Sequence, residues 1–252
     1  MLLITYDATH LMTLRINKNL QTSVLAQKFK SQNRIHIANF FQQQDAYKLS
    51  DYVKAISEWN LSLNSAEKHF DVTHEHRKSV QPDFYQQLTA SVGRDAIEGF
   101  QYFFENYAVY DAYYNNKCPE PLARMFEFLN SEPFIACMRE ITGLNNIQFA
   151  DAQLTKYAKG HFLTEHDDNV AGKNRLVAYV LNLSPVWRAE WGSLLMFHDH
   201  NNHIEQAFTP AFNSLNLFAV PQRHSVSQVA SYVTASRYSV TGWLRAGSDP
   251  RK

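Results

Sequence analysis

Two side chains that commonly bind metals lie two positions apart in the segment 161–169, which reads HFLTEHDDN. His166 offers an imidazole and Asp168 offers a carboxylate. On an extended strand, residues i and i+2 project from the same face, so this spacing directs both groups toward one point. A third donor, His224, lies far downstream in the segment 220–226, which reads VPQRHSV. These residue types predict a metal site with His166, Asp168 and His224 as its ligands.

Two imidazoles and one carboxylate on one face of a metal ion leave its other coordination positions open. That is the donor set of a non-haem Fe(II) oxygenase centre. Arg237 lies thirteen positions beyond His224, in the segment 236–243, which reads SRYSVTGW. A guanidinium at that place could hold the far carboxylate of a keto-acid cosubstrate by a charge-assisted, often bidentate contact. Taken alone, each of these residues is more typical of an ordinary strand, loop or surface position, so the hypothesis depends on the complete set.

The C-terminal part of the chain has a pattern that could bring these distant residues together. After residue 143, short apolar runs alternate with turn signals, which is typical of a sandwich or a jelly-roll barrel. The predicted strands are 147–157, 162–166, 176–183, 193–197, 203–208, 214–220, 225–233 and 238–244. The mouth of a jelly roll joins strands that are distant in sequence. We therefore expect His166 and Asp168 from the second strand to meet His224 and Arg237 from the last two.

The fold predicted from these patterns is α+β, mainly β. A double-stranded β-helix, the jelly-roll or cupin-like arrangement, is predicted for residues 144–248, with a helical N-terminal support over residues 1–143. Helical spacing of apolar residues predicts helices within 19–34, 41–56, 82–107, 122–129 and 131–141. Extended segments are expected at 35–40 and 59–63, with a polar loop over 64–81. Because no linker composition separates the two parts, we expect the helices to cover one outer face of the sheet in a single unit.

Composition and charge narrow the class of protein. The chain has 252 residues, 45% of them hydrophobic, and 24 basic side chains balance 24 acidic ones, so no overall field favours nucleic acid or an acidic membrane. Cys118 and Cys137 form neither a disulfide framework nor a zinc motif. No segment reaches the length of a membrane span, and the N-terminus lacks the pattern of a signal peptide. We therefore expect a cytoplasmic protein without nucleic-acid or membrane partners.

Three further features are weaker candidates for function. The stretch 8–44 has basic but no acidic residues, which is more typical of a solvated helix face than of a partner-binding patch. His74 and His76 lie in a polar segment without a third ligand nearby. The segment 198–203 reads HDHNNH, but its two central asparagines are typical of an exposed hairpin tip. We expect none of these segments to hold a metal.

About the last 110 residues resemble the prolyl-4-hydroxylase-type 2-oxoglutarate/Fe(II) dioxygenases. The segment 154–168, LTKYAKGHFLTEHDD, contains the Tyr-x-x-Gly-x-x-x-x-x-His-x-Asp pattern of that family. The resemblance continues in register through 174–183, 191–197, 212–218 and 237–243. It looks closest to the branch that hydroxylates prolines in ribosomal proteins and translation factors. Residues 1 to about 143 are similar to the family mainly in layout, with helices before a barrel.

The resemblance implies a role for each member of the set. His166, Asp168 and His224 would bind Fe(II), and 2-oxoglutarate would chelate the iron. The far carboxylate of 2-oxoglutarate would pair with Arg237, in a pocket lined by Tyr157. Together with O₂, and with ascorbate as a candidate further cofactor, this centre would convert 2-oxoglutarate to succinate and carbon dioxide. A C–H bond of a prolyl residue in a protein substrate would be hydroxylated in the same reaction.

The resemblance also assigns two substrate residues, and the chain departs from the family at three positions. Arg175 and Trp243 match positions that lie at the substrate entrance in related enzymes. Ser193 stands where a second glycine is frequent, and Asn182 stands where many relatives carry a second pocket tyrosine. Asp167 lies between two expected ligands, and strand alternation should point it away from the metal.

Two alternative functions stay open at this stage. The same iron centre could act on a free amino acid or a small metabolite instead of a protein. Alternatively, the chain could be a non-catalytic jelly-roll binding module that has kept the ligand residues. A shallow open cleft would favour a polypeptide substrate, whereas a closed pocket would favour a small molecule.

Overall fold

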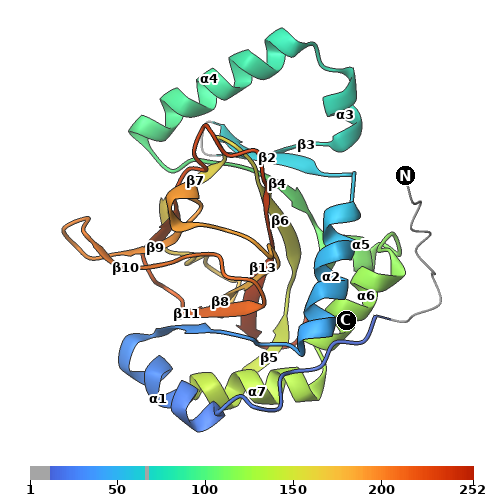
Figure 1. The fold of residues 1–252 in the computed structure, drawn as a ribbon, viewed down its shortest axis with the longest axis vertical. Coiled ribbons are helices and arrows are strands. Elements are labelled where there is room, and N and C mark those ends of the chain that lie inside the picture. Colours follow the sequence, from blue (N-terminus) through green and yellow to red (C-terminus); the bar gives the residue numbers. More distant parts are fainter. Residues whose placement is uncertain (1–11, 66–67) are drawn as a thin grey trace.

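A mainly antiparallel sheet forms the body of the protein, as shown by a computed structural model that describes residues 12–65 and 68–252 (Figure 1). The strands in these ranges are β1 (Arg34–Ile37), β2 (Asn60–Ser65), β3 (Lys68–Val72), β4 (Tyr102–Tyr107), β5 (Ile147–Ala150), β6 (Gln153–Tyr157), β7 (Phe162–His166), β8 (Arg175–Asn182), β9 (Leu195–His198), β10 (Ile204–Phe208), β11 (Ser214–Ala219), β12 (His224–Val226) and β13 (Arg237–Ala246). Their order along the sheet is β1-β11-β8-β13-β6-β4-β7-β12-β9-β10, with β2 and β3 added beside β4 and β5 beside β13. The sheet curls into a nearly closed, jelly-roll-like barrel, which confirms the predicted fold class.

Most helices pack on one outer side of this barrel. The helices are α1 (Thr22–Gln32), α2 (Gln43–Ala55), α3 (His74–Ser79), α4 (Pro82–Glu98), α5 (Val109–Tyr114), α6 (Glu120–Leu129) and α7 (Glu132–Thr142). Figure 1 shows α1, α2, α5, α6 and α7 against the sheet, whereas α3 and α4 form an arm at the top of the view. Leu49, Phe134, Tyr179 and Leu217 belong to the large core between the packed helices and the sheet, and each is almost completely buried. This core fixes the outer face of the strands whose inner face carries the site.

Strand register brings the expected site residues into two neighbouring pairs. In β12 and β7, His224 lies directly opposite His166. In β13 and β6, Arg237 lies directly opposite Tyr157. Because side chains alternate between the faces of a strand, residues paired in this way can project into the barrel together.

Several segments differ from the sequence prediction. The strand expected over 147–157 is divided into β5 and β6, and the strand expected over 225–233 ends at Val226. The helix expected over 82–107 ends at Glu98, and Tyr102–Tyr107 forms strand β4 between β6 and β7. Aromatic residues favour strands, and hydrogen bonding on both sides outweighs the helical spacing. The expected polar loop 64–81 contains β3 and α3, and the Thr73 side chain accepts a hydrogen bond from the His76 backbone N–H at the start of α3.

The part of the chain before residue 143 is therefore not only helical, since it contributes β1 to β4 to the common sheet. The division at residue 143 stays a prediction. No helix within residues 12–65 and 68–252 has the length and apolar character that a membrane crossing needs. Residues 1–11, which include the start of the basic stretch and the N-terminus searched for a signal peptide, lie outside the described residues.

Candidate active site

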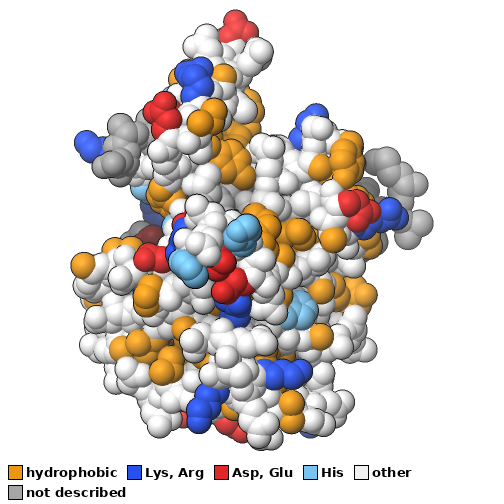
Figure 2. Space-filling view, turned by 90° about the vertical axis from the view of Figure 1, so that its left-hand side faces the viewer, with side chains coloured by type: hydrophobic (Ala, Val, Ile, Leu, Met, Phe, Trp, Pro, Cys, Tyr) orange, Lys and Arg blue, Asp and Glu red, His pale blue; other side chains and the backbone are white. Residues whose placement is uncertain are grey.

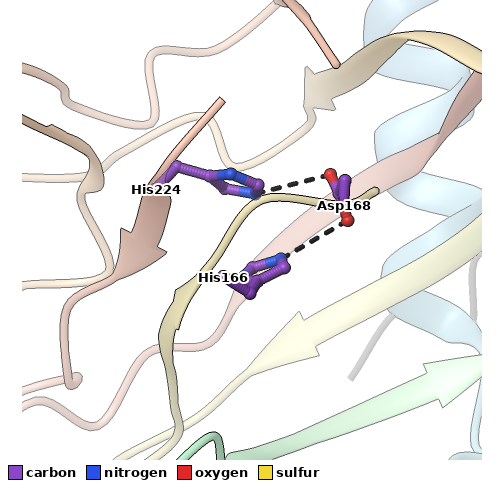
Figure 3. Close-up of side chains that lie close together, drawn as sticks. All are labelled: His166, Asp168 and His224. Carbon is purple, nitrogen blue, oxygen red and sulfur yellow. Dashed lines mark ion pairs between the residues drawn. The ribbon is translucent and has the colours of Figure 1, made fainter. Parts of the chain in front are cut away.

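Three potential metal ligands converge at the mouth of the barrel (Figure 3). One donor atom each from His166, Asp168 and His224 lies within 4.8 Å of the other two. The Nε2 atom of His166 is 3.4 Å from Asp168 Oδ1, and the Nε2 atom of His224 is 3.5 Å from Asp168 Oδ2. The structure thus brings together the three residues that the sequence singled out, with their donor atoms directed at one another.

Asp168 reaches this point by a different backbone conformation from the one expected. Strand β7 ends at His166, and Asp168 has a left-handed conformation with φ of 64°. The expectation of two ligands on one face of a continuous extended strand was wrong, because the chain turns directly after the first ligand. Asp167 is exposed, and its Oδ1 atom accepts a hydrogen bond from the Asn169 backbone N–H, 2.9 Å away. It takes no part in the cluster of donor atoms.

Backbone carbonyl groups orient both imidazoles. The Nδ1 atom of His166 is 3.1 Å from the Thr164 carbonyl oxygen, and the Nδ1 atom of His224 is 2.7 Å from the Gln222 carbonyl oxygen. An Nδ1–H group donating to each carbonyl leaves the Nε2 lone pairs free for a metal. Such contacts from outside the ligand shell fix the tautomer and the ring orientation.

Two of the three candidate ligands, His224 and Asp168, have the protonation states that binding of a cation requires. Burial and the charge of His166 lower the pKa of His224 to about 4, so its imidazole is neutral near neutral pH. Burial alone would raise the pKa of Asp168, but the close approach of His166 and the charge of His224 outweigh burial and lower it. A neutral imidazole and an ionised carboxylate are the forms that bind divalent metals.

Arg237 is a buried cation on the same side of the barrel. Its side chain is almost fully enclosed, and burial lowers its pKa to about 10. Its Nη1 atom donates to the Ser193 carbonyl oxygen at 2.9 Å, and its Nη2 atom donates to Asn182 Oδ1 at 3.2 Å. Among the described residues, its Nε atom has no hydrogen-bond partner and no carboxylate forms an ion pair with it. An uncompensated buried guanidinium is a ready site for an anionic group.

Two of the family departures noted in the sequence lie directly against Arg237. Asn182 also donates from Nδ2 to Ser214 Oγ at 3.0 Å, which fixes the amide that faces the guanidinium. Ser193 has a left-handed φ of 54°, and its hydroxyl oxygen is 3.2 Å from Arg237 Nη1. The sequence did not predict this contact between Ser193 and Arg237. Tyr157 lies with its ring 5.5 Å from the guanidinium carbon and stacks on Phe104 at 5.2 Å.

Arg175 and Trp243 form one stacked unit beside the metal ligands. The guanidinium carbon of Arg175 lies 3.4 Å from the centre of the Trp243 ring. Its Nη1 atom donates to the backbone carbonyl oxygen of Asp168 at 3.1 Å. Within the described chain, Arg175 Nε and Trp243 Nε1 are buried without a hydrogen-bond partner. The Arg175 Nε–H group is available to a bound molecule, whereas the Trp243 side chain lies close enough to the Asp168 carboxylate to help lower the pKa of Asp168.

One cavity of about 640 Å³ joins all of these groups. Its lining includes the three candidate ligands together with Tyr157, Arg175, Arg237 and Trp243. It also includes Phe100, Tyr102 and His69, which the sequence did not single out as site residues. The aromatic density after Gly99 was the available signal, but it was assigned to a helix rather than to a strand facing the barrel.

The other histidine-containing segments lie apart from this cavity. His198 ends β9, and the residues from His200 to His203 form an exposed hairpin tip before β10. Figure 2 views the molecule from the left-hand side of Figure 1, and several histidine side chains are visible on the face that it shows. His74 and His76 lie in the short helix α3. Within the described residues, the only group with metal-site geometry is the one at the barrel mouth.

Parts of the chain are similar in sequence to known proteins. Residues 152–245 match the family described as the 2OG-Fe(II) oxygenase superfamily. Over 132 residues, the chain is 31% identical to mouse (Mus musculus) prolyl 3-hydroxylase OGFOD1, an alignment that covers 50% of this chain and 24% of that protein. The chain thus matches about a quarter of the length of this curated relative.

Solved structures show the same fold at low sequence identity. A prolyl-4-hydroxylase from Pseudomonas putida is 13% identical, with a TM-score of 0.57 over 90% of this chain and 100% of that chain. A prolyl hydroxylase from Trichoplax adhaerens, solved with a hypoxia-inducible-factor peptide fragment, is 14% identical, with a TM-score of 0.55 over 89% of each chain. An oxidoreductase of the 2OG-Fe(II) oxygenase family from Burkholderia pseudomallei is 12% identical, with a TM-score of 0.59 over 94% of this chain and 97% of that chain.

Proposed function

We propose that this chain, whose residues 152–245 form a domain of the 2OG-Fe(II) oxygenase superfamily, is an Fe(II)- and 2-oxoglutarate-dependent dioxygenase that hydroxylates a prolyl residue in a protein. A translation-related protein is the substrate that we favour. The prolyl target is supported by the relative named prolyl 3-hydroxylase, which the chain matches over only part of its length, and the translation-related substrate by the family resemblance seen in the sequence.

The observation that carries the proposal is one cavity containing both a metal-ligand set and an unpaired buried cation. His166, Asp168 and His224 supply the donor set of a non-haem Fe(II) centre with positions left open. Arg237 supplies a buried positive charge for which the described residues provide no carboxylate. A dicarboxylate that chelates iron at one end and meets a guanidinium at the other satisfies both groups at once.

The residues of the chain would perform distinct tasks in this reaction. Bound iron and 2-oxoglutarate supply the oxidative chemistry, in which O₂ is consumed and succinate and carbon dioxide are formed. His166 and His224 hold their Nε2 donors in place, and Asp168 offsets the metal charge. Arg237 fixes the far carboxylate, while Tyr157 closes that end of the pocket against water. Ascorbate remains a candidate further cofactor, in keeping with the family resemblance.

A polypeptide suits the outer part of the cavity better than a small metabolite does. Phe100 and Val170 line the cavity, yet they are 47% and 46% exposed. The site therefore continues into an open apolar rim instead of closing around a small ligand. Arg175 and Trp243 stand beside the candidate ligands, and no described residue binds Arg175 Nε, so we propose that these two side chains contact the substrate. Cys118 and Cys137 are unpaired, and we keep the reducing cytoplasm as the proposed compartment.

An anaerobic titration with Fe(II) and 2-oxoglutarate tests the centre. We expect a weak visible charge-transfer band at about 500 nm, the usual region for Fe(II) keto-acid chelates. The band should be absent in His166→Ala and present in His200→Ala, which removes an exposed histidine of the hairpin tip. The absence of a band in the unmodified protein would contradict the proposed centre.

Comparing proteins from cells with and without this chain tests the reaction. Mass spectrometry should reveal a gain of about 16 Da, one oxygen atom, on a prolyl residue in cells that contain the unmodified chain. The gain should disappear in cells that carry His166→Ala. Oxygen added to a free amino acid or metabolite, with no modified protein, would instead support the small-molecule reading.

A further inference from the structure

A row of aromatic rings leads from the candidate metal centre to the hairpin formed by β2 and β3. The ring of Phe100 lies 5.3 Å from that of His166, and the ring of Tyr102 lies 5.5 Å from that of Phe100. His69 on β3 stacks on Tyr102 at 5.8 Å. All of these residues line the same cavity. The rings of Phe100, Tyr102 and His69 are called the aromatic row below.

Hydrogen bonds hold the aromatic row in place. His69 Nδ1 is 2.6 Å from the Tyr102 hydroxyl, and His69 Nε2 is 3.2 Å from a carboxylate oxygen of Asp71. The backbone carbonyl of Phe100 accepts a hydrogen bond from Asn64 Nδ2 at 2.8 Å. The Phe100 ring is therefore exposed although a hydrogen bond holds its backbone in place.

The length of the row indicates the size of its ligand. The ring-to-ring step from His166 to Phe100 and the two steps within the row are each longer than 5 Å. A polyproline-II segment advances about 3.1 Å per residue, so each of these steps is longer than one residue of such a segment. A free amino acid held at the metal would leave the outer rings uncovered. Several residues of an extended chain would cover them.

The chemistry of the row indicates the kind of chain. Aromatic-lined grooves bind proline-containing segments in the polyproline-II conformation, since these segments are already extended and lose little conformational entropy. Val170 also lines the cavity and is 46% exposed, so the cavity presents further apolar surface beside the row. Hydrophobic side chains on the projecting arm and on the body below it are visible in Figure 2, but the aromatic row is the part that is continuous with the metal centre.

We propose that the aromatic row is the binding platform for the polypeptide segment around the target proline, with Phe100 as a residue that determines specificity for prolyl substrates. This proposal rests on the proposed function for the reaction at the metal. It adds residues from β3 and β4, in a part of the chain that the family match does not cover. The Tyr102 hydroxyl and His69 act as positioning groups for the row.

Peptide binding by the iron-loaded protein tests the platform directly. The probe is an array of synthetic 15-residue peptides with a central proline, paired with a set in which that proline is alanine. Binding is measured without oxygen, with Fe(II) and 2-oxoglutarate present, so no turnover occurs. We expect the unmodified protein to retain proline peptides in preference to their alanine counterparts.

Two phenylalanine variants separate the platform from general surface effects. Phe100→Ala should weaken binding of the retained peptides about tenfold, because an aromatic contact with the proline ring is lost. Phe84→Ala is the matched control, since Phe84 is 44% exposed on α4 and does not line the cavity. Phe100→Leu keeps an apolar side chain and should still lose most of the proline preference. The visible chelate band reports whether the metal centre is assembled in each variant.

The outcomes distinguish this proposal from the proposed function. Equal peptide affinity in Phe100→Ala and the unmodified protein overturns the platform, as does an unmodified protein that forms the chelate band but retains no proline peptide. A missing chelate band contradicts the iron centre instead. Proline-dependent binding that is sensitive to Phe100 would still support the platform in that case.

Discussion

Asp168 has to satisfy a conformational requirement as well as a chemical one. Its left-handed φ of 64° turns the chain at the end of β7, and its two carboxylate oxygens each face an imidazole. Outside glycine, that conformation is tolerated best by asparagine and aspartate. Most substitutions at this position would therefore disturb the backbone and the ligand set together.

Asp168→Asn separates the two requirements. Asparagine accepts the same φ and has nearly the same volume, so we expect a stability change below about 1 kcal/mol. The neutral amide no longer offsets a dication, and Fe(II) affinity should fall by at least about 100-fold, the upper range for lost contacts outside the ligand shell. Asp167→Asn is the matched control and should bind iron normally. Calorimetric titration under anaerobic conditions measures both, and equal affinities in the two variants would contradict the ligand role of Asp168.

At the residue scale, the sequence predicted which side chains meet but not how they meet. His166, Asp168, His224 and Arg237 could be singled out because their types match one chemistry. The turn at Asp168 could not be predicted, because two polar residues after a strand are compatible with both a continuing strand and a turn. The contact between Ser193 and Arg237 joins residues far apart in the chain, and no local pattern reports it.

At the element scale, β13 depends on a close approach that only glycine permits. Gly242 lies opposite Tyr179 in the pairing of β13 with β8. A Cβ atom at position 242 would lie 2.1 Å from the Asp151 carbonyl oxygen, which is closer than real contacts allow. The strand that carries Arg237 and Trp243 therefore sits tightly against the turn between β5 and β6.

Gly242→Ala should shift that strand and lower the free energy of unfolding by about 3 kcal/mol or more. For a chain of this size the melting temperature would fall by roughly 6 °C or more. Gly93→Ala is the opposite case, since Gly93 lies in α4 with no atom within 4 Å of an added Cβ. Alanine there should stabilise the protein by about 0.5–1 kcal/mol through helix propensity. Thermal unfolding followed by circular dichroism compares the two, and equal effects would contradict the packing argument.

The β2–β3 hairpin carries a pair whose strength depends on pH. The hydrogen bond with Asp71 raises the pKa of His69. Burial alone would raise the pKa of Asp71, but its bonds with His69 and Ser62 outweigh burial and lower it. The His69 contribution is present below its unfolded pKa and is lost as pH rises through the folded value. The Asp71 contribution is present above its unfolded pKa and is lost as pH falls through the folded value. The pair therefore supports the hairpin most strongly in mildly acidic solution.

A proton NMR titration checks this pair. The His69 ring should titrate above the ordinary histidine value of about 6.5, and Asp71→Asn should move it back toward that value. The exposed ring of His200, at the hairpin tip, serves as the reference within the same spectrum. A His69 titration that does not respond to Asp71→Asn would show that the pair does not form in solution.

Element prediction worked where an amphipathic pattern had clear ends. Helix α7 (Glu132–Thr142) lies within one residue of the helix predicted over 131–141, and Gly143, with a left-handed φ of 73°, follows its end. It failed for β4, because the aromatic residues from Phe100 to Tyr107 fit a helical stripe as well as a strand. Only pairing with β6 and β7, from a distant part of the chain, decides between the two.

At the scale of the whole molecule, the barrel encloses a charge that no carboxylate of residues 12–65 and 68–252 neutralises. Burial lowers the pKa of Arg237 from its ordinary value to about 10, which corresponds to a cost of roughly 3 kcal/mol for keeping it charged. Because both values lie above neutral pH, this cost applies throughout the physiological range and is relieved only in strongly alkaline solution. A site prepared for an anion thus reduces the stability of the protein without its ligand.

Arg237→Met should therefore uncouple stability from the cosubstrate. The methionine fills most of the space without the charge, so we expect the ligand-free variant to melt no lower than the unmodified protein. With Fe(II) bound, 2-oxoglutarate at about 100 times its dissociation constant should stabilise the unmodified protein by about 2.7 kcal/mol, or roughly 5–10 °C. The variant should lose this shift. Arg188→Met, at an exposed arginine, is the control and should keep it. A ligand-free Arg237→Met protein that melts several degrees lower but still responds to 2-oxoglutarate would mean that the guanidinium supports the fold instead of binding the cosubstrate.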